Sequence, residues 1–309
     1  MDGSPIALPL LPDMPVTVHH PLRQTVPVVF ASPHSGRAYP AEFIAAARLD
    51  PLGLRRSEDS FVDLLFADAP ANGAPLLAAR FPRAYCDANR EAWELDPGMF
   101  EDRLPDFVNT ASPRVGAGLG TIPRVVASGE GIYRHRLSFA EAERRIRDCW
   151  EPYHATLAAL IEATRAQFGA CLLIDCHSMP SLFQRDGARG TGWGAARPNG
   201  RTAPPAGPDI VLGDAHGTAC APAVTRFMDQ ALRDLGYLVR RNDPYAGGYV
   251  TRHYGRPREG VHVLQLELAR ALYMDETRIE ALARFDLVRE DVARLIGRLT
   301  AEAAALLAG

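Results

Sequence analysis

Short apolar runs alternate along the chain with stretches in which apolar residues recur every three or four positions. The runs end at polar, Gly or Pro residues, as buried strands do. They predict strands at residues 26–34, 75–81, 170–178, 208–214, 237–244 and 261–270. The helical periodicity predicts helices at residues 57–72, 138–169 and 222–236, and further helices between residues 276 and 307. Strands that alternate with helices, several of them apolar throughout, predict an α/β fold whose central sheet has helices on both faces.

The pattern predicts a single domain at residues 26–309, preceded by an irregular, Pro-rich segment at residues 1–25. No repeat and no linker divides that domain. The longest helix is expected to start after Ser138 and to end at Gly169, because these are residue types that cap helices. Pro152 is expected to kink or split it.

The composition is that of an ordinary soluble enzyme. The 309 residues are 47% hydrophobic and 23% charged, and the net charge is -3. This charge gives no reason to expect a nucleic acid or an anionic membrane as partner. No apolar run approaches the roughly 18 residues that span a bilayer, and the N-terminus lacks the features of a signal peptide. A cytoplasmic protein is expected, and the sequence does not indicate its oligomeric state.

Two residue types qualify this picture. All 34 basic residues are Arg, whose planar guanidinium suits the recognition of carboxylates. The five Cys are widely spaced and form no CxxC pair, so they are expected to be reduced and mostly buried. Cys176 is next to His177, but adjacent strand residues point to opposite faces, which argues against a Cys–His nucleophile.

Polar side chains stand at the ends of several predicted strands, where α/β sheets bind their ligands. His34 and His177 are each the first imidazole after an apolar strand. Glu58 or Asp59, at the start of the helix predicted for residues 57–72, could add a carboxylate. Two His, one carboxylate and a water form a common catalytic zinc shell. Each residue also has a simpler interpretation: a hydrogen-bonded loop His, or an acid favoured by the helix dipole.

Glu267 lies within the apolar run VHVLQLELA. A carboxylate in a buried strand is costly unless it is paired, bound to a metal or catalytic. A structural salt bridge with one of the Arg residues is the alternative. Asn89 and Arg90 follow another strand and could equally form a turn with a surface ion pair.

Together these motifs resemble the N-formylglutamate amidohydrolase family. The resemblance covers residues 26 to 270 in the family's order and rests on SPHSG (32–36), SEDSFVD (57–63), DANR (87–90), DCHSMPS (175–181), GDAHGTAC (213–220), PYAGGYVTRHYG (244–255) and LQLEL (264–268). It implies a fold like that of the zinc carboxypeptidases and aspartoacylase-like deacylases, with a mixed central sheet. It also implies hydrolysis of N-formyl-L-glutamate to formate and L-glutamate, a step of histidine degradation, with Zn²⁺ as cofactor and a small-molecule substrate as partner.

The resemblance also implies roles for individual residues. His34 and His177 would bind zinc, and Asp59 would be the third ligand. Glu58 is the alternative, because Ser60 replaces the aromatic residue that follows the family's acid. Glu267 would be the general base that takes a proton from water and passes it to the leaving amine. The residues expected to bind substrate carboxylates are Asn89, Arg90 and Arg252.

Three alternatives remain at this point. The nearest is a deacylase or carboxypeptidase-like amidase of the same mechanism that acts on another N-acyl amino acid. An Fe(II) oxygenase is disfavoured, because His34 and Asp59 lack the H-x-D spacing typical of that class. A binding protein without activity would have no need of a buried base at Glu267. Residues 183–208 look longer than the family's usual link, and a fold of this segment over the site would alter which substrate is accepted.

Overall fold

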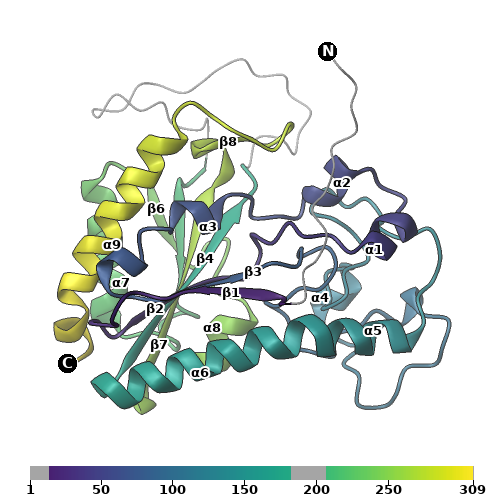
Figure 1. Cartoon of the computed structure of the whole chain (residues 1–309), viewed down its shortest axis with the longest axis horizontal. Coiled ribbons are helices and arrows are strands. Elements are labelled where there is room, and N and C mark those ends of the chain that lie inside the picture. Colours follow the sequence, from purple (N-terminus) through teal and green to yellow (C-terminus); the bar gives the residue numbers. More distant parts are fainter. Residues whose placement is uncertain (1–13, 182–206, 309) are drawn as a thin grey trace. The chain divides into compact units, whose positions relative to one another are not determined.

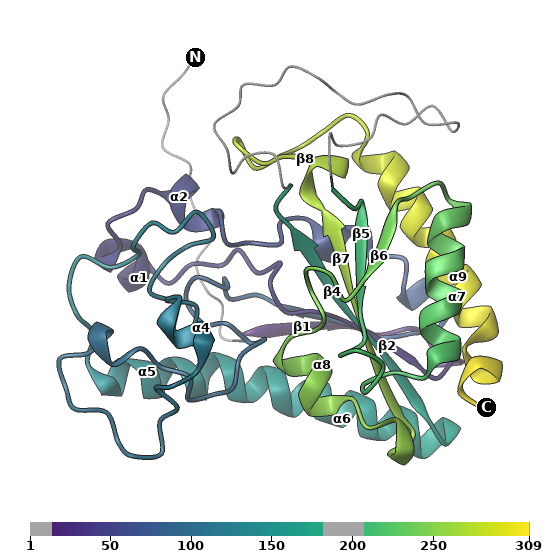
Figure 2. The same cartoon turned by 180° about the vertical axis from the view of Figure 1, so that it is seen from behind.

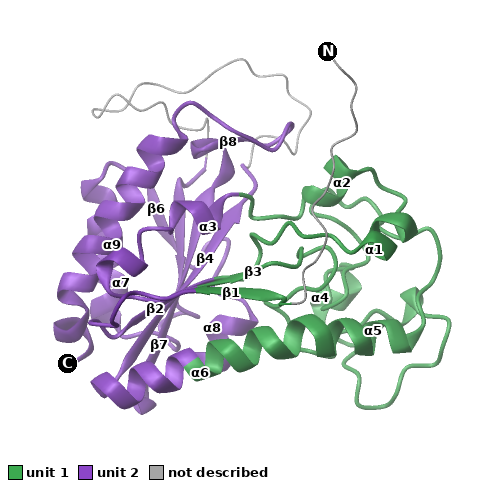
Figure 3. Ribbon diagram, viewed as in Figure 1, with its two compact units in different colours: residues 1–18, 32–60, 77–159 green, residues 19–31, 61–76, 160–309 purple. Residues whose placement is uncertain are grey.

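The computed structural model describes residues 14–181 and 207–308. Most of the segment at 183–208 therefore lies outside the described residues. Contacts divide the chain into two compact units, coloured in Figure 3. Unit 1 comprises residues 1–18, 32–60 and 77–159, and unit 2 comprises residues 19–31, 61–76 and 160–309. That the chain forms a single domain stays a prediction.

A seven-stranded sheet forms the centre of the fold (Figure 1). Its strands, in the order in which they are hydrogen-bonded, are β1 (Val16–His19), β3 (Leu76–Ala79), β2 (Val28–Ser32), β4 (Cys171–Met179), β7 (Val261–Ala269), β5 (Ile210–Gly213) and β6 (Val239–Arg241). The pairs β2–β4, β4–β7 and β5–β6 are parallel, whereas β5–β7 is antiparallel. The predicted mixed α/β sheet is confirmed.

β4 and β7 are the longest strands, and every residue in both is buried. Their near-continuous apolar sequences suit strands that are covered on both faces. Their register pairs His177 with Glu267. β2 pairs with β4 as far as Ala31 and Asp175, so the polar residues after β2 follow a strand that adjoins β4. His34 thus follows β2 and His177 lies within the adjacent strand β4.

Helices of unit 2 cover the sheet. α3 (Val62–Leu65) and α9 (Phe285–Leu307) contact β4, and α8 (Tyr249–Tyr254) contacts β7. α7 (Pro222–Asp234) packs against α9. Figures 1 and 2 place α7 and α9 on one side of the sheet and α8 on the other, as the sequence predicted. A two-stranded sheet, β8 (Met274–Asp275) with β9 (Glu280–Ala281), precedes α9.

The other helices are α1 (Ala41–Ala46), α2 (Pro51–Arg55), α4 (Pro113–Gly116), α5 (Phe139–Arg145) and α6 (Glu151–Phe168). Short turns are η1 (Pro70–Asn72), η2 (Pro97–Met99), η3 (Ile146–Trp150), η5 (Pro257–Glu259) and η6 (Arg270–Leu272). No helix among residues 14–181 and 207–308 has both the length and the apolar character needed to cross a bilayer.

The prediction of one helix over residues 57–72 is wrong. Phe61 adopts a left-handed conformation, with a φ of 69°, which stops a helix from passing through it. What forms is α3 alone, followed by turns and η1. Ser57 caps no helix, and its hydroxyl instead accepts a hydrogen bond from the backbone of Ala127. Glu58 and Asp59 therefore lie in a loop, so the helix dipole does not explain them.

The ends of the longest predicted helix are confirmed. The hydroxyl of Ser138 accepts a hydrogen bond from the backbone of Glu141, and Gly169 follows the last turn with a φ of 83°. Between α5 and α6 the chain forms η3, a π-helical turn just before Pro152. The segment at residues 1–25 is not irregular throughout, because it contains β1.

Unit 1 buries an unusual cation. The side chain of Arg145 is 1% exposed, and its guanidinium lies 4.2 Å from the ring centre of Tyr85. The rings of Phe43 and Tyr133 lie at 5.3 and 5.4 Å. The group also donates hydrogen bonds to Tyr133 and to Glu141. Aromatic faces and these acceptors replace the water that the charge would otherwise require.

All five Cys are reduced and buried, as predicted. Burial raises the pKa of three of the thiols, those of Cys149, Cys171 and Cys220, to about 12. It raises the pKa of the Cys86 and Cys176 thiols well above the ordinary value. Neutral, buried thiols are poor nucleophiles, so no Cys qualifies for covalent catalysis.

Candidate metal and hydrolase site

His34 lies two residues beyond the end of β2, and its side chain is 1% exposed. The loop of residues 57–60 is attached to it, because the backbone N–H of Asp59 donates a 2.9 Å hydrogen bond to the carbonyl of His34. The Nδ1 atom of His34 lies 3.3 Å from Oδ2 of Asp59. Its Nε2 atom lies 2.7 Å from Oδ1 of Asp87. One ring edge therefore faces a candidate ligand and the other a supporting carboxylate.

Asp87 is held in place from several sides. Nε of Arg83 donates to its Oδ2 at 2.9 Å, and the backbone N–H of Asn89 donates to its Oδ1 at 2.9 Å. Burial alone would raise the pKa of Asp87, but the charges of Arg83 and Arg90 and the hydrogen bond with His34 hold it well below its usual value. An ionised Asp87 accepts the Nε2–H of His34, which assigns the lone pair to Nδ1. A supporting carboxylate is typical of His residues that bind metals.

His177 is part of β4 and has its own carboxylate. Asp175, two residues earlier on the same face, is fully buried, and its Oδ2 lies 3.0 Å from Nε2 of His177. The two atoms are not aligned as in a good hydrogen bond, and neither oxygen of Asp175 has such a partner among the described residues. A buried carboxylate in that state is expensive, which makes a purely structural role for it a poor explanation.

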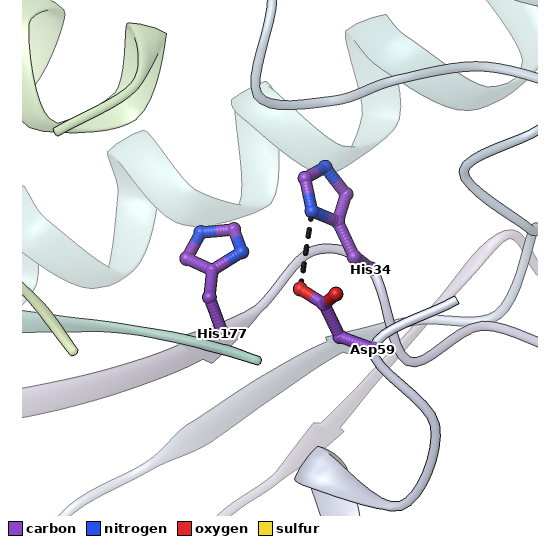
Figure 4. Close-up of side chains that lie close together, drawn as sticks. All are labelled: His34, Asp59 and His177. Atoms are coloured by element: carbon purple, nitrogen blue, oxygen red, sulfur yellow. Dashed lines mark ion pairs between the residues drawn. The ribbon is translucent and has the colours of Figure 1, made fainter. Parts of the chain in front are cut away.

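His34, Asp59 and His177 form a group that could hold a metal ion. Each offers one ligand atom, and these atoms all lie within 4.8 Å of one another. Figure 4 shows the three side chains turned toward one another. Two ligand atoms bound to one ion at about 2.05 Å in tetrahedral geometry are about 3.3 Å apart. The separation of 3.3 Å between Nδ1 of His34 and Oδ2 of Asp59 matches this value.

Glu58, the alternative ligand, is engaged elsewhere. Its carboxylate accepts hydrogen bonds from Tyr39 at 2.7 Å and from Ser60 at 2.8 Å. Nε of Arg55 lies 3.1 Å from both of its oxygens. These donors occupy both oxygens of Glu58. Among the described residues, the group that could bind a metal contains Asp59 instead. The geometry thus favours Asp59 over Glu58.

Glu267, the expected base, is buried in β7. It is the register partner of His177, and residues paired in register project from the same face of a sheet. Its Oε1 accepts a 2.9 Å hydrogen bond from Nε2 of Gln265. The carboxylate therefore belongs to the sheet face that carries His177.

The three residues expected to bind carboxylates differ in their surroundings. Arg90 is buried, and its Nε and Nη1 donate to the carbonyls of Leu119 and Asn89 at 2.8 and 2.7 Å. Burial lowers the pKa of Arg90 to about 10. Asn89 is buried beside it. Arg252 is exposed on α8. Arg252 thus has the more accessible guanidinium, whereas two donors of Arg90 are already used within unit 1.

Asp87, Asp175 and Gln265 were not among the residues singled out from the sequence. Each nevertheless lies within one of the sequence motifs described above: Asp87 in DANR, Asp175 in DCHS and Gln265 in LQLEL. Asp175 and Gln265 each precede a candidate site residue by two positions on a strand, and that spacing places both side chains on one face. This signal was available for these two residues, whereas the partnership of Asp87 with His34 depends on the fold.

Comparisons with known proteins agree with this picture. The family model for N-formylglutamate amidohydrolase matches residues 26–274. The chain is 32% identical over 263 residues to an N-formylglutamate deformylase of Pseudomonas aeruginosa, covering 82% of this chain and 84% of that protein. A second N-formylglutamate deformylase, from Pseudomonas putida, is 29% identical over 259 residues, with 82% of this chain and 83% of that protein covered.

Solved structures give the same result. The crystal structure of an N-formylglutamate amidohydrolase from Ralstonia eutropha JMP134 is similar with a TM-score of 0.82 and 36% identity, covering 93% of this chain and 97% of that one. A protein of Agrobacterium tumefaciens, 17% identical with a TM-score of 0.58, shares the fold. These comparisons define the protein as a hydrolase of the amidohydrolase class. The chain belongs to the N-formylglutamate amidohydrolase family.

Proposed function

We propose that this protein hydrolyses N-formyl-L-glutamate to formate and L-glutamate with the help of one bound zinc ion. The observation that carries the proposal is the buried group of His34, Asp59 and His177 next to a strand that bears Glu267. The names of the relatives support the choice of substrate. Reduced, buried thiols agree with a cytoplasmic location.

The donor set suits zinc. Two imidazoles and one carboxylate are the ligands of several catalytic zinc sites, which leave a further position open for water or substrate. Asp87 would fix the ring of His34 through its hydrogen bond to Nε2, and the carboxylate of Asp175, 3.0 Å from Nε2 of His177, would favour a proton on that atom, so that both Nδ1 atoms would be available to the ion. When bound there, zinc would polarise the formyl carbonyl and lower the pKa of water to about 7.

Glu267 would carry the proton. It would accept the proton from water as the new C–O bond forms on the formyl carbon, and would then donate it to the glutamate nitrogen as the C–N bond breaks. The sheet face that Glu267 shares with His177 gives it access to the reacting group. Its burial removes competing water, so the carboxylate keeps a fixed position.

Arginine side chains would hold the two carboxylates of the substrate. Arg252 is exposed and can offer a planar two-point contact. Arg90 and Asn89 would contact the α-carboxylate through the donors that remain to them. A substrate held at both carboxylates presents its formyl group in one orientation, which favours N-formylglutamate over N-formyl derivatives of apolar amino acids.

The proposal is tested by measuring formate release and metal content together. Purified protein loaded with one equivalent of zinc should release formate from N-formyl-L-glutamate, and activity should disappear with the metal in a chelator and return with zinc. N-acetyl-L-glutamate and N-formyl-L-leucine are the comparison substrates. Comparable kcat/KM for N-formyl-L-leucine would contradict the assigned amino acid, and faster turnover of the acetyl compound would contradict the assigned acyl group.

A further inference from the structure

Gln265 makes hydrogen bonds with both ends of its side-chain amide. It lies two residues before Glu267 on β7, so both side chains project from the same face. Its Nε2 donates to Oε1 of Glu267 at 2.9 Å, and its Oε1 accepts the backbone N–H of Gly248 at 2.8 Å. The N–H of Gly248 needs an acceptor, so the amide oxygen must face it and the NH₂ group must face the carboxylate.

The loop of residues 245–247 is seated directly on the sheet next to Gln265. Gly213, the last residue of β5, is the register partner of Gln265. A Cβ atom on Gly213 would lie 2.8 to 2.9 Å from backbone atoms of residues 245–247, so a side chain there would push the loop away. The backbone N–H of Ala215 adds a 2.7 Å hydrogen bond to the carbonyl of Ala246.

The same loop leads into α8. Gly248 is the N-cap residue of α8, the helix that carries Arg252. Gly247 has a φ of 121°, a conformation open to glycine, and a Cβ atom there would lie 2.7 Å from Thr251. The backbone conformation of residues 245–248, which connect the sheet to α8, is therefore closely defined. The side-chain oxygen of Gln265 binds the N–H of Gly248, the residue at which the helix begins.

We infer that Gln265 is a positioning residue that fixes Glu267 and the start of α8 relative to each other. The side-chain amide of Gln265 contacts both Glu267, which would move the proton, and the start of α8, which carries Arg252. It thereby keeps the distance between Glu267 and α8 constant, as a substrate of fixed length requires. The inference rests on the proposed function. It also gives a role to the motif GDAHGTAC, which the proposed reaction does not use, and to the part of PYAGGYVTRHYG that precedes Arg252; the two segments form the two sides of this support.

The test replaces Gln265 by Met, which has a similar length and no hydrogen-bonding NH₂ or carbonyl group. With N-formyl-L-glutamate, Gln265→Met should lower kcat about tenfold to a hundredfold, the range for one hydrogen bond to a charged group. KM should rise as well, because α8 loses its anchor. Gln230→Met makes the same chemical change on the exposed face of α7 and should alter neither constant.

Two further variants separate the two ends of the amide. Gly213→Ala displaces the loop without touching Glu267, so it should raise KM and leave kcat within about twofold. In a Glu267→Gln background, Gln265→Met should cost little further kcat but should still raise KM.

Hydrogen exchange provides a readout that needs no substrate. In Gln265→Met the backbone amides of Gly248 and α8 should exchange with solvent faster than in wild type. The backbone amides of α7 should exchange at the wild-type rate. If wild type does not hydrolyse N-formyl-L-glutamate but α8 loses protection, the proposed function fails and the anchoring role stands. If kcat, KM and α8 protection in Gln265→Met all match those of Gln230→Met, the inference is wrong.

Discussion

Replacing Glu58 or Asp59, which are adjacent, by Ala should have different effects on zinc binding and on the stability of the fold. Asp59→Ala removes a candidate ligand, so the bound zinc should be lost. Glu58→Ala removes a carboxylate that is 2% exposed and accepts hydrogen bonds from Tyr39, Ser60 and Arg55. The zinc ligands would remain. The first change thus affects the metal and the second affects the fold.

The cost of Glu58→Ala follows from its contacts. The side chain of Arg55 is 16% exposed, so the ion pair is mostly shielded from water. Breaking a buried pair by removing one partner costs about 3–5 kcal/mol, because the other charge stays buried. The hydroxyl of Tyr39 would also lose its acceptor. Burial, followed by the charge of Glu58, raises the pKa of Tyr39 well above its usual value, so this hydroxyl remains a donor at any ordinary pH.

The assay is thermal unfolding of the metal-free proteins together with zinc content after reconstitution. Glu58→Ala should unfold on the order of 10 °C below wild type and still bind one equivalent of zinc. Asp59→Ala should unfold near the wild-type temperature without metal, and should fail to retain zinc. Zinc retained by Asp59→Ala and lost by Glu58→Ala would refute the assignment. A metal-free Glu58→Ala as stable as wild type would refute the energetic reasoning.

Three further predictions concern the base, the supporting carboxylates and the buried cation. Glu267→Gln should keep its zinc and lose about 10²–10⁴-fold in kcat, and near-normal formate release would make Glu267 structural. Asp87→Asn and Asp175→Asn should each bind zinc about 10–100-fold more weakly in competition with a chelator, and wild-type affinity in both would exclude a supporting role. Arg145→Met should lower the free energy of unfolding in urea by about 3 kcal/mol, since Glu141 and the aromatic rings lose their cation. An unchanged urea midpoint would mean that Arg145 contributes no net stability.

The strands of the sheet could be predicted from the sequence because buried strands leave a plain signal. The apolar run at residues 171–174 and the largely apolar run that begins at residue 261 indicate buried strands, and the structure has β4 and β7 at residues 171–179 and 261–269. The pairing of β2 with β4, which brings His34 close to His177, is a contact between distant parts of the chain and is known from the structure alone. A two-residue periodicity would also have placed Asp175 and Gln265 on the faces of His177 and Glu267.

The segment around the third ligand could not be predicted in the same way. Its apolar positions after Phe61 fit a helix, but Phe61 has a left-handed backbone and Asp59 is held by the carbonyl of His34. Such a contact between distant parts of the chain outweighs local helix propensity. For the same reason the role of Glu58 was not visible, since its partner Tyr39 is 19 positions away.

The five buried thiols can be used to measure how fast different parts of the protein unfold locally. Cys86 and Cys149 belong to unit 1, and Cys171, Cys176 and Cys220 belong to unit 2. A thiol with a raised pKa and no exposure is alkylated at the rate at which its surroundings open. Mass spectrometry of alkylated peptides would therefore time each unit separately without any engineered label. A common rate for all five in mild denaturant would mean that the chain unfolds as one cooperative domain, and two distinct rates would mean that it does not.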